Sequence, residues 1–226
     1  MKNSLTFTPL FLAIAATITP IAHAADTLPA DGFVEGSHLN INTRNYYMNR
    51  DRRDIHTDDS KEWGQGFLGT FESGYTQGTV GFGLDVLGLY AVKLDGGRGT
   101  INSQLLPVHG TGNDRHAPDD FGRTAVAAKA KLSKTELKVG EWFAVLPILR
   151  ADDGRSLPQT FQGAQLTSNE IDGLTLYGGQ FWKNSQRNDA SREDMSFGGV
   201  KGDDFYFGGG EYRFNGNNTM VGVWHD

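Results

Sequence analysis

The chain of 226 residues contains no cysteine, which excludes a disulfide framework, thiol catalysis and the lipidated cysteine of a lipoprotein. After its N-terminal region it also lacks any apolar run long enough to form a membrane-spanning helix. Basic residues are outnumbered, with 21 Lys and Arg against 27 Asp and Glu, and the net charge is -6. This acidity argues against a nucleic-acid partner, which requires a basic surface.

The N-terminal region has the three parts of a secretory signal peptide. Lys2 gives a short basic start, residues 10–18 form a compact apolar core, and Ala22 and Ala24 form an Ala-x-Ala cleavage motif. We therefore predict a signal peptide over residues 1–24, a mature chain that begins near Ala25, and export from the cytoplasm.

The mature region alternates apolar and polar residues at every second position in several short stretches. The clearest stretch places Val80, Phe82 and Leu84 on one face and Asp85 on the other. Only helices and closed barrels can cross a bilayer, and strands with one lipid face and one polar lumen face produce this alternation. The 30 glycines and the 11% aromatic residues are typical of the same architecture. The sequence predicts an all-β fold, a transmembrane antiparallel β-barrel in the outer membrane.

We expect about nine strands, separated by short turns at one end and long loops at the other. Residues 133–134 form a predicted turn, and Trp63, Phe67, Phe71 and Tyr75 form a predicted outward row. The clearest strands lie within 38–47, 62–75, 79–93, 126–132, 136–140, 174–181, 204–214 and 220–224. Residues 50–60, 95–120, 143–163 and 184–195 are predicted loops.

The end of the sequence is unusual for a barrel. An odd number of strands does not close an ordinary bacterial barrel, and an open edge leaves unpaired backbone groups in lipid. The last strand is short, and the final residue is Asp226 rather than an aromatic residue. We expect the chain to be an N-terminal portion of a longer protein; the alternative is a small complete barrel with one strand misassigned.

Several motifs resemble the outer membrane porin D (OprD) family. They include RNYYMNRD at 44–51, ESGYTQGTVGFG at 72–83, KLDG at 93–96, LPV at 106–108 and RSLPQT at 155–160. The resemblance covers essentially the whole mature chain. It implies a barrel of roughly eighteen strands, often packed as loose trimers, of which this chain supplies about the first half. It also implies passive, selective uptake of small carboxylate-bearing nutrients, such as amino acids, small peptides or aromatic acids.

Strand parity identifies candidate residues that line the pore. We expect the cations to guide a carboxylate and the acids to oppose them across the lumen. The alternative is that these charges pair with one another and hydrate the wall. The candidates are Arg44, Asp85, Lys129, Lys131 and Lys138.

The loop at about 144–163 is the candidate constriction. Pro147 and Pro158 fix φ in its two arms and stiffen it, and its position in the resemblance favours an inward fold over a surface loop. Its candidate pore residues are Asp152, Asp153, Arg155, Ser156, Gln159 and Thr160.

Two motifs resemble a cofactor site and a metal site, but we predict that neither binds such a group. Gly64, Gly66 and Gly69 match the dinucleotide fingerprint, but they lie in a strand pattern with no helix after it. His109 and His116 share a loop with acidic residues, at a spacing that matches no closed metal site. We predict no cofactor, no metal and no catalytic residue.

The expected partners are small-molecule permeants with a carboxylate, outer membrane lipid, lipopolysaccharide and a loose homotrimer. Three other readings remain open: a non-functional truncated barrel, an outer-membrane barrel enzyme, and a soluble β-sandwich that binds a ligand. The enzyme would need a convergent catalytic set, and the sandwich would have polar rather than aromatic outward faces.

Overall fold

The computed structural model describes residues 32–51, 59–96, 101, 103–197, 200–202, 204–216 and 218–226. The predicted signal peptide at 1–24 and most of the predicted loop at 50–60 lie outside these residues. Within the described ranges, no helix has the length and apolar content that crossing a membrane requires.

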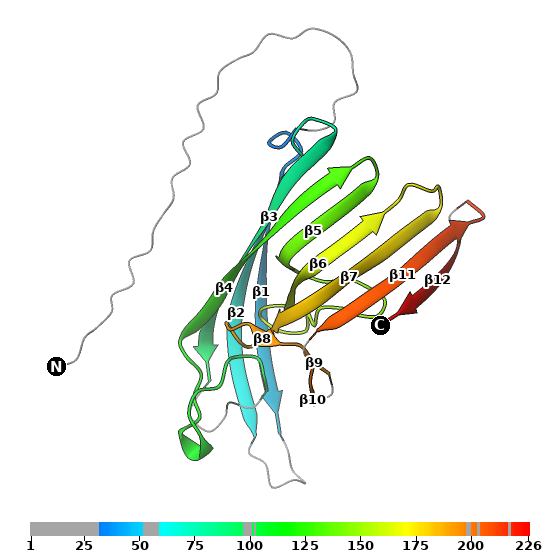
Figure 1. Ribbon diagram of the computed structural model, residues 1–226. Coiled ribbons are helices and arrows are strands. Elements are labelled where there is room, and N and C mark those ends of the chain that lie inside the picture. Colours follow the sequence, from blue (N-terminus) through cyan, green and yellow to red (C-terminus); the bar gives the residue numbers. More distant parts are fainter. Residues whose placement is uncertain are drawn as a thin grey trace, which may run out of the picture.

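Nine strands pair in chain order to form one antiparallel, strongly curved sheet (Figure 1). A two-residue strand, β8 (Glu193–Asp194), pairs with β7, and β9 (Ser196–Phe197) pairs with β10 (Val200–Lys201) in a separate hairpin. The nine are β1 (His38–Arg50), β2 (Ser60–Glu72), β3 (Val80–Asp95), β4 (Asp120–Leu132), β5 (Thr135–Trp142), β6 (Thr160–Ser168), β7 (Leu174–Ser185), β11 (Phe205–Phe214) and β12 (Thr219–His225).

Short connections lie at one end of the sheet and long ones at the other, as the sequence predicts. The tightest is the predicted turn between β4 and β5, where Ser133 adopts a positive φ of 54°. The long connections are 96–119, 143–159 and 186–204, and the first of them contains a single turn of 3-10 helix, η1 (Gly112–Asp114).

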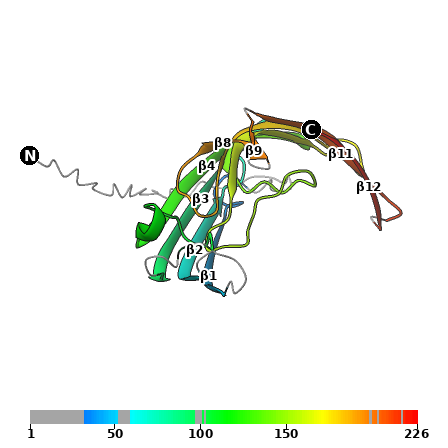
Figure 2. The same ribbon diagram turned by 90° about the horizontal axis from the view of Figure 1, so that it is seen from below.

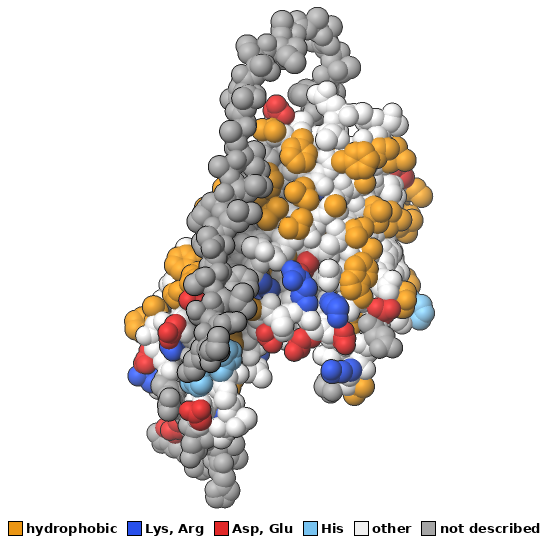
Figure 3. All heavy atoms as spheres, turned by 60° about the vertical axis from the view of Figure 1, so that its left-hand side comes forward, with side chains coloured by type: hydrophobic (Ala, Val, Ile, Leu, Met, Phe, Trp, Pro, Cys, Tyr) orange, Lys and Arg blue, Asp and Glu red, His pale blue; other side chains and the backbone are white. Residues whose placement is uncertain are grey.

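The convex face of the sheet is apolar, which confirms the predicted parity of most strands. Val126 on β4, Leu137 on β5 and Phe82 on β3 are all exposed there. Hydrophobic side chains gather over the strands on this face, with charged side chains below them (Figure 3). Tyr75 was expected in this outward row but is not part of it, because β2 ends at Glu72 and the ring turns to the concave face.

The concave face is polar only in part, because two long connections fold back onto it (Figure 2). Residues 101–117 and Leu157 cover inward side chains of β2, β3 and β4 in one apolar cluster, comprising Leu68, Leu89, Ala91, Ile101, Leu105, Leu106, Ala117, Phe121 and Leu157. A second cluster lies under residues 144–149, against Phe161, Phe181, Phe205 and Phe207. Full burial of one leucine contributes about 1.5–3 kcal/mol, so both connections are held firmly on the wall.

Several predicted boundaries are wrong. β2 ends at Glu72 rather than near Tyr75, β4 begins at Asp120 rather than near Val126, and no strand was predicted over β6. Residues 160–163 were assigned to the constriction loop, but β6 begins at Thr160 and pairs with β5. The loop therefore runs over 143–159. Pro147 and Pro158 both lie within it, outside the strands, as expected for proline.

Candidate functional site

A charged cluster on the concave wall joins three neighbouring strands. Asp85 on β3 forms ion pairs with Lys129 of β4, at 2.7 Å, and Lys138 of β5, at 2.5 Å. The two lysines are register partners, so their like charges would repel if no acid lay between them. The Asp85 carboxylate is almost fully buried and therefore holds both cations at a fixed place on the wall.

Tyr75 extends this cluster toward the short-turn end. Its hydroxyl donates a hydrogen bond to the Glu136 carboxylate, and the ammonium groups of Lys129 and Lys131 lie 5.1 and 5.4 Å from its ring centroid. Cations over a ring face are attracted by its quadrupole, which keeps both lysines near the wall. Within the part of the chain that the structure describes, Lys131 makes no ion pair, unlike Lys129 and Lys138.

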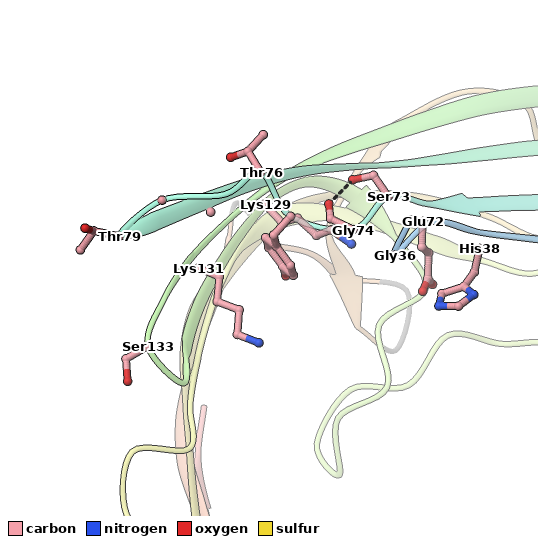
Figure 4. Close-up of a pocket in the computed structure, with 13 residues that line it drawn as sticks. Gly36, His38, Glu72, Ser73, Gly74, Thr76, Thr79, Lys129, Lys131 and Ser133 are labelled. Atoms are coloured by element: carbon pink, nitrogen blue, oxygen red, sulfur yellow. Dashed lines mark hydrogen bonds between the residues drawn. The ribbon is translucent and has the colours of Figure 1, made fainter. Parts of the chain in front are cut away.

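A hollow of about 530 Å³ opens beside this cluster (Figure 4). Lys131 points into it from β4, while His38 of β1 and Glu72 of β2 lie beside each other on another side. Hydroxyl groups of Thr76, Thr79 and Ser133 lie along its rim. The hollow is therefore lined by both signs of charge and by neutral hydrogen-bonding groups.

The tip of the 143–159 loop forms two ion pairs, one with β1 of the wall and one with the 186–204 connection. Both terminal nitrogens of the Arg44 guanidinium, on β1, donate hydrogen bonds to the Asp153 carboxylate, one of them at 3.1 Å. Arg187 forms an ion pair with Asp152. The Asp152 side chain also accepts a hydrogen bond from the backbone of Gly154 at 2.9 Å. A bidentate arginine fixes orientation as well as distance, so the loop tip has a defined position.

Arg155 links this loop to the 96–119 connection, because its guanidinium donates to the Ser103 carbonyl at 3.3 Å. Burial, together with the charge of Arg187, lowers the pKa of Arg155. Arg187 in turn donates to the Gln104 side chain at 2.8 Å. Three long connections are therefore tied together over the concave face.

Three predicted constriction residues lie away from the tip of the loop, against the wall. Ser156 is fully buried against β2, and Thr160 is fully buried in β6, where it donates a hydrogen bond to Glu141. Gln159 is partly buried and donates to Asn184 at 3.3 Å. The sequence placed all six candidates on the constriction loop, but only Asp152, Asp153 and Arg155 lie at its tip. From Ser156 the chain packs against β2, and it enters β6 at Thr160.

The glycine motif of β2 has a structural role that the sequence did not predict. A side chain on Gly66 would place its Cβ 2.2 Å from the Ser156 carbonyl oxygen, and one on Gly64 would lie 3.1 Å from the Ser156 hydroxyl. The two glycines therefore leave the space in which the constriction loop sits against the wall.

This close approach gives a direct test. We expect Gly66→Ala to lower the free energy of unfolding by about 1–3 kcal/mol, because the added methyl group forces the loop backbone away from β2. Gly88→Ala is the matched control, since a Cβ at this position of β3 would meet no other atom within 4 Å. Guanidinium unfolding of the complete porin in detergent measures the free energy of unfolding of both variants. Equal stability of the two variants would show that the loop adapts at no cost.

Two further charged residues were missed because nothing in their spacing marks them. Arg123 on β4 is buried and donates to backbone carbonyls of Pro158, Gln186 and Asp189. Glu62 on β2 is buried and accepts from the backbone N–H groups of Ser103 and Leu106. Their partners lie in connections far along the chain, so only the fold reveals them.

The predicted pore residues thus form two groups. Asp85, Lys129, Lys131 and Lys138 come together on the wall, and Arg44 joins the loop tip instead. Among the residues the structure describes, no group of three or more His, Cys, Asp or Glu side chains has the arrangement of a metal site.

Comparisons with known proteins agree with this architecture. Residues 31–226 match the model of a family described as outer membrane porin, OprD family. The porin-like protein GalP of Pseudomonas putida is 56% identical over 92% of this chain and 52% of its own length, and Porin D of Pseudomonas aeruginosa is 40% identical over 91% and 47%. The chain spans about half the length of these relatives.

Solved structures show the same relationship. A BenF-like porin from Pseudomonas fluorescens Pf-5 has a TM-score of 0.81 and 55% identity, over 85% of this chain and 50% of that one. OccK2 (OpdF) of Pseudomonas aeruginosa, solved in complex with glucuronate, has a TM-score of 0.72 and 49% identity, over 86% and 47%. OpdK of the same species, solved with vanillate, has a TM-score of 0.77 and 47% identity, over 86% and 49%.

Proposed function

Because the chain belongs to the OprD family of outer membrane porins, we propose that it supplies about half of a selective channel for small carboxylates. The observation that carries the proposal is Lys131, which makes no ion pair with the residues that the structure describes and points into the hollow. Beside it, Lys129 and Lys138 both contact the carboxylate of Asp85, while the Glu136 carboxylate accepts a hydrogen bond from Tyr75. An ammonium group without an ion pair raises the concentration of anions beside it.

The loop tip supplies the other requirement, which is a narrow opening of fixed width. The Arg44–Asp153 and Arg187–Asp152 pairs hold the 143–159 loop over the concave face. A rigid loop excludes solutes by size, and the wall charges then act on those that pass. The channel forms only when the rest of the barrel closes the open edges at β1 and β12.

The relatives support the class of permeant. Glucuronate and vanillate, which are named in two of the solved complexes, are both small cyclic carboxylates. Within the proposal, the apolar convex face contacts outer membrane lipid and lipopolysaccharide, a cleavable signal peptide directs export, and barrels pack as loose trimers.

The experiment measures glucuronate uptake by liposomes that contain the complete porin of which this chain is part. We expect Lys131→Gln to lower uptake about fivefold, because one unit charge about 4 Å from a carboxylate is worth about 1 kcal/mol in water. Lys134→Gln is the control, since Lys134 lies in the β4–β5 turn and pairs with Asp172 at 3.4 Å. Unchanged uptake in Lys131→Gln, or an equal fall in Lys134→Gln, would overturn the proposal.

A further inference from the structure

The 96–119 connection ends in a small hairpin that brings two histidines together. The backbone N–H of His109 donates to the His116 carbonyl at 2.8 Å, and the N–H of His116 donates back at 2.9 Å. The residues are therefore direct cross-strand partners, with side chains on the same face. Their imidazole ring centroids lie 6.2 Å apart, at an interplanar angle of 73°.

The ring of His116 is held in one orientation. Its Nδ1 lies 2.8 Å from the backbone carbonyl oxygen of Asp114, which can only accept a hydrogen bond. Nδ1 therefore carries the proton, and in the neutral ring Nε2 keeps a free lone pair. Metal-binding histidines in proteins usually donate the N–H of their second ring nitrogen to a backbone carbonyl or a carboxylate, as Nδ1 of His116 does here.

We propose that His109 and His116 form a two-histidine site for a borderline divalent transition cation such as Zn²⁺ or Cu²⁺. With metal–nitrogen bonds of about 2.0–2.1 Å and a tetrahedral angle, the two ring centroids would lie about 5 Å apart. The observed 6.2 Å needs to close by only about 1 Å, which rotation of the exposed His109 side chain allows while the His116 ring stays in place. Imidazole ligands favour zinc, copper and nickel over calcium and magnesium, which prefer oxygen.

Six residues separate the two histidines, which is not the spacing of a helical or zinc-finger metal motif. The hairpin, rather than the spacing in the sequence, brings the two side chains together. Between the two histidines, the Nε of Arg115 donates to the Gly112 carbonyl at 3.3 Å, within the turn of the hairpin. A bound metal would join the two arms of the hairpin and complete its coordination with water. The site is independent of the charged wall, since it lies at the long-loop end of the sheet.

Calorimetric titration of the complete porin with ZnCl₂ tests the site, and electron paramagnetic resonance with CuCl₂ counts the nitrogen ligands. We expect one Zn²⁺ per chain and a copper signal from two imidazole nitrogens. His109→Ala and His116→Ala should each weaken zinc binding at least tenfold, because a single exposed imidazole cannot chelate. His225→Ala is the control and should leave binding unchanged.

The wall provides a second control. Lys131→Gln should leave zinc binding unaltered, so failure of the channel proposal and failure of the metal site can be told apart. The proposal would be overturned if either single histidine variant bound zinc as strongly as the wild-type porin, or if the copper signal came from one nitrogen only.

Discussion

Replacement of Arg123 by methionine should lower the free energy of unfolding by about 3 kcal/mol or more. The buried guanidinium donates hydrogen bonds to carbonyls in two long connections, at Pro158, Gln186 and Asp189. Each hydrogen bond to a charged donor contributes about 1.5–3 kcal/mol, and a buried acceptor left without a donor costs about 1–3 kcal/mol. Methionine fills similar volume, so the loss reflects the hydrogen bonds rather than a cavity.

The same change should alter the channel. Without this anchor the 143–159 loop and the 186–204 connection lose a common attachment, so single-channel currents in planar bilayers should become larger and noisier. Arg213→Met is the control, because Arg213 is exposed on β11 and only approaches Glu211 at 4.0 Å. Arg123→Lys serves if the methionine variant fails to fold, since it keeps the charge but not the planar fork. Wild-type stability and steady wild-type currents in both Arg123 variants would contradict the anchor.

Neutralisation of Asp85 should shift the ion preference of the channel toward anions. In Asp85→Asn, Lys129 and Lys138 keep their charges, face each other in register and lose the carboxylate that both contact. Removing one partner of a buried ion pair leaves uncompensated charge, so we also expect a stability loss of about 3 kcal/mol. The reversal potential in a potassium chloride gradient measures the preference.

The control for this change is Asp172→Asn, which removes an exposed carboxylate paired with Lys134 in the turn region. It should change neither the reversal potential nor the stability. If Asp85→Asn left the reversal potential at the wild-type value, the wall lysines would not contribute to selectivity, and the permeant class would depend on other charges.

Most of the sheet could be predicted from sequence because its outward face obeys a simple rule. Exposed positions on the convex face, such as Val126 and Leu137, are apolar at every second residue, and the alternation shows directly in the sequence. β6 was not predicted, for a physical reason. The first residues of the strand are buried under a loop, and Thr160 and Phe161 both face protein, so the alternation that marks a strand is lost.

The wall of the candidate site was also predictable, because parity alone places Asp85, Lys129 and Lys138 on the concave face. The loops were harder. Leu105 and Leu106 follow no period, and their burial against β2 and β3 depends on contacts distant in sequence. The roles of the β2 glycines and of the buried Arg123 could not be predicted, because they depend on contacts with the 143–159 loop that only the fold creates.

The two apolar clusters beneath the long connections affect the electrostatic field inside the proposed channel. Hydrocarbon replaces water under the charged contacts, so the local dielectric constant falls well below that of bulk solvent. A pair of charges about 4 Å apart is worth about 1 kcal/mol in water and about 4 kcal/mol at an effective dielectric constant of 20. In the proposed channel, these buried leucines therefore strengthen the attraction of a carboxylate to the wall lysines, and loop packing and charge selectivity depend on the same buried residues.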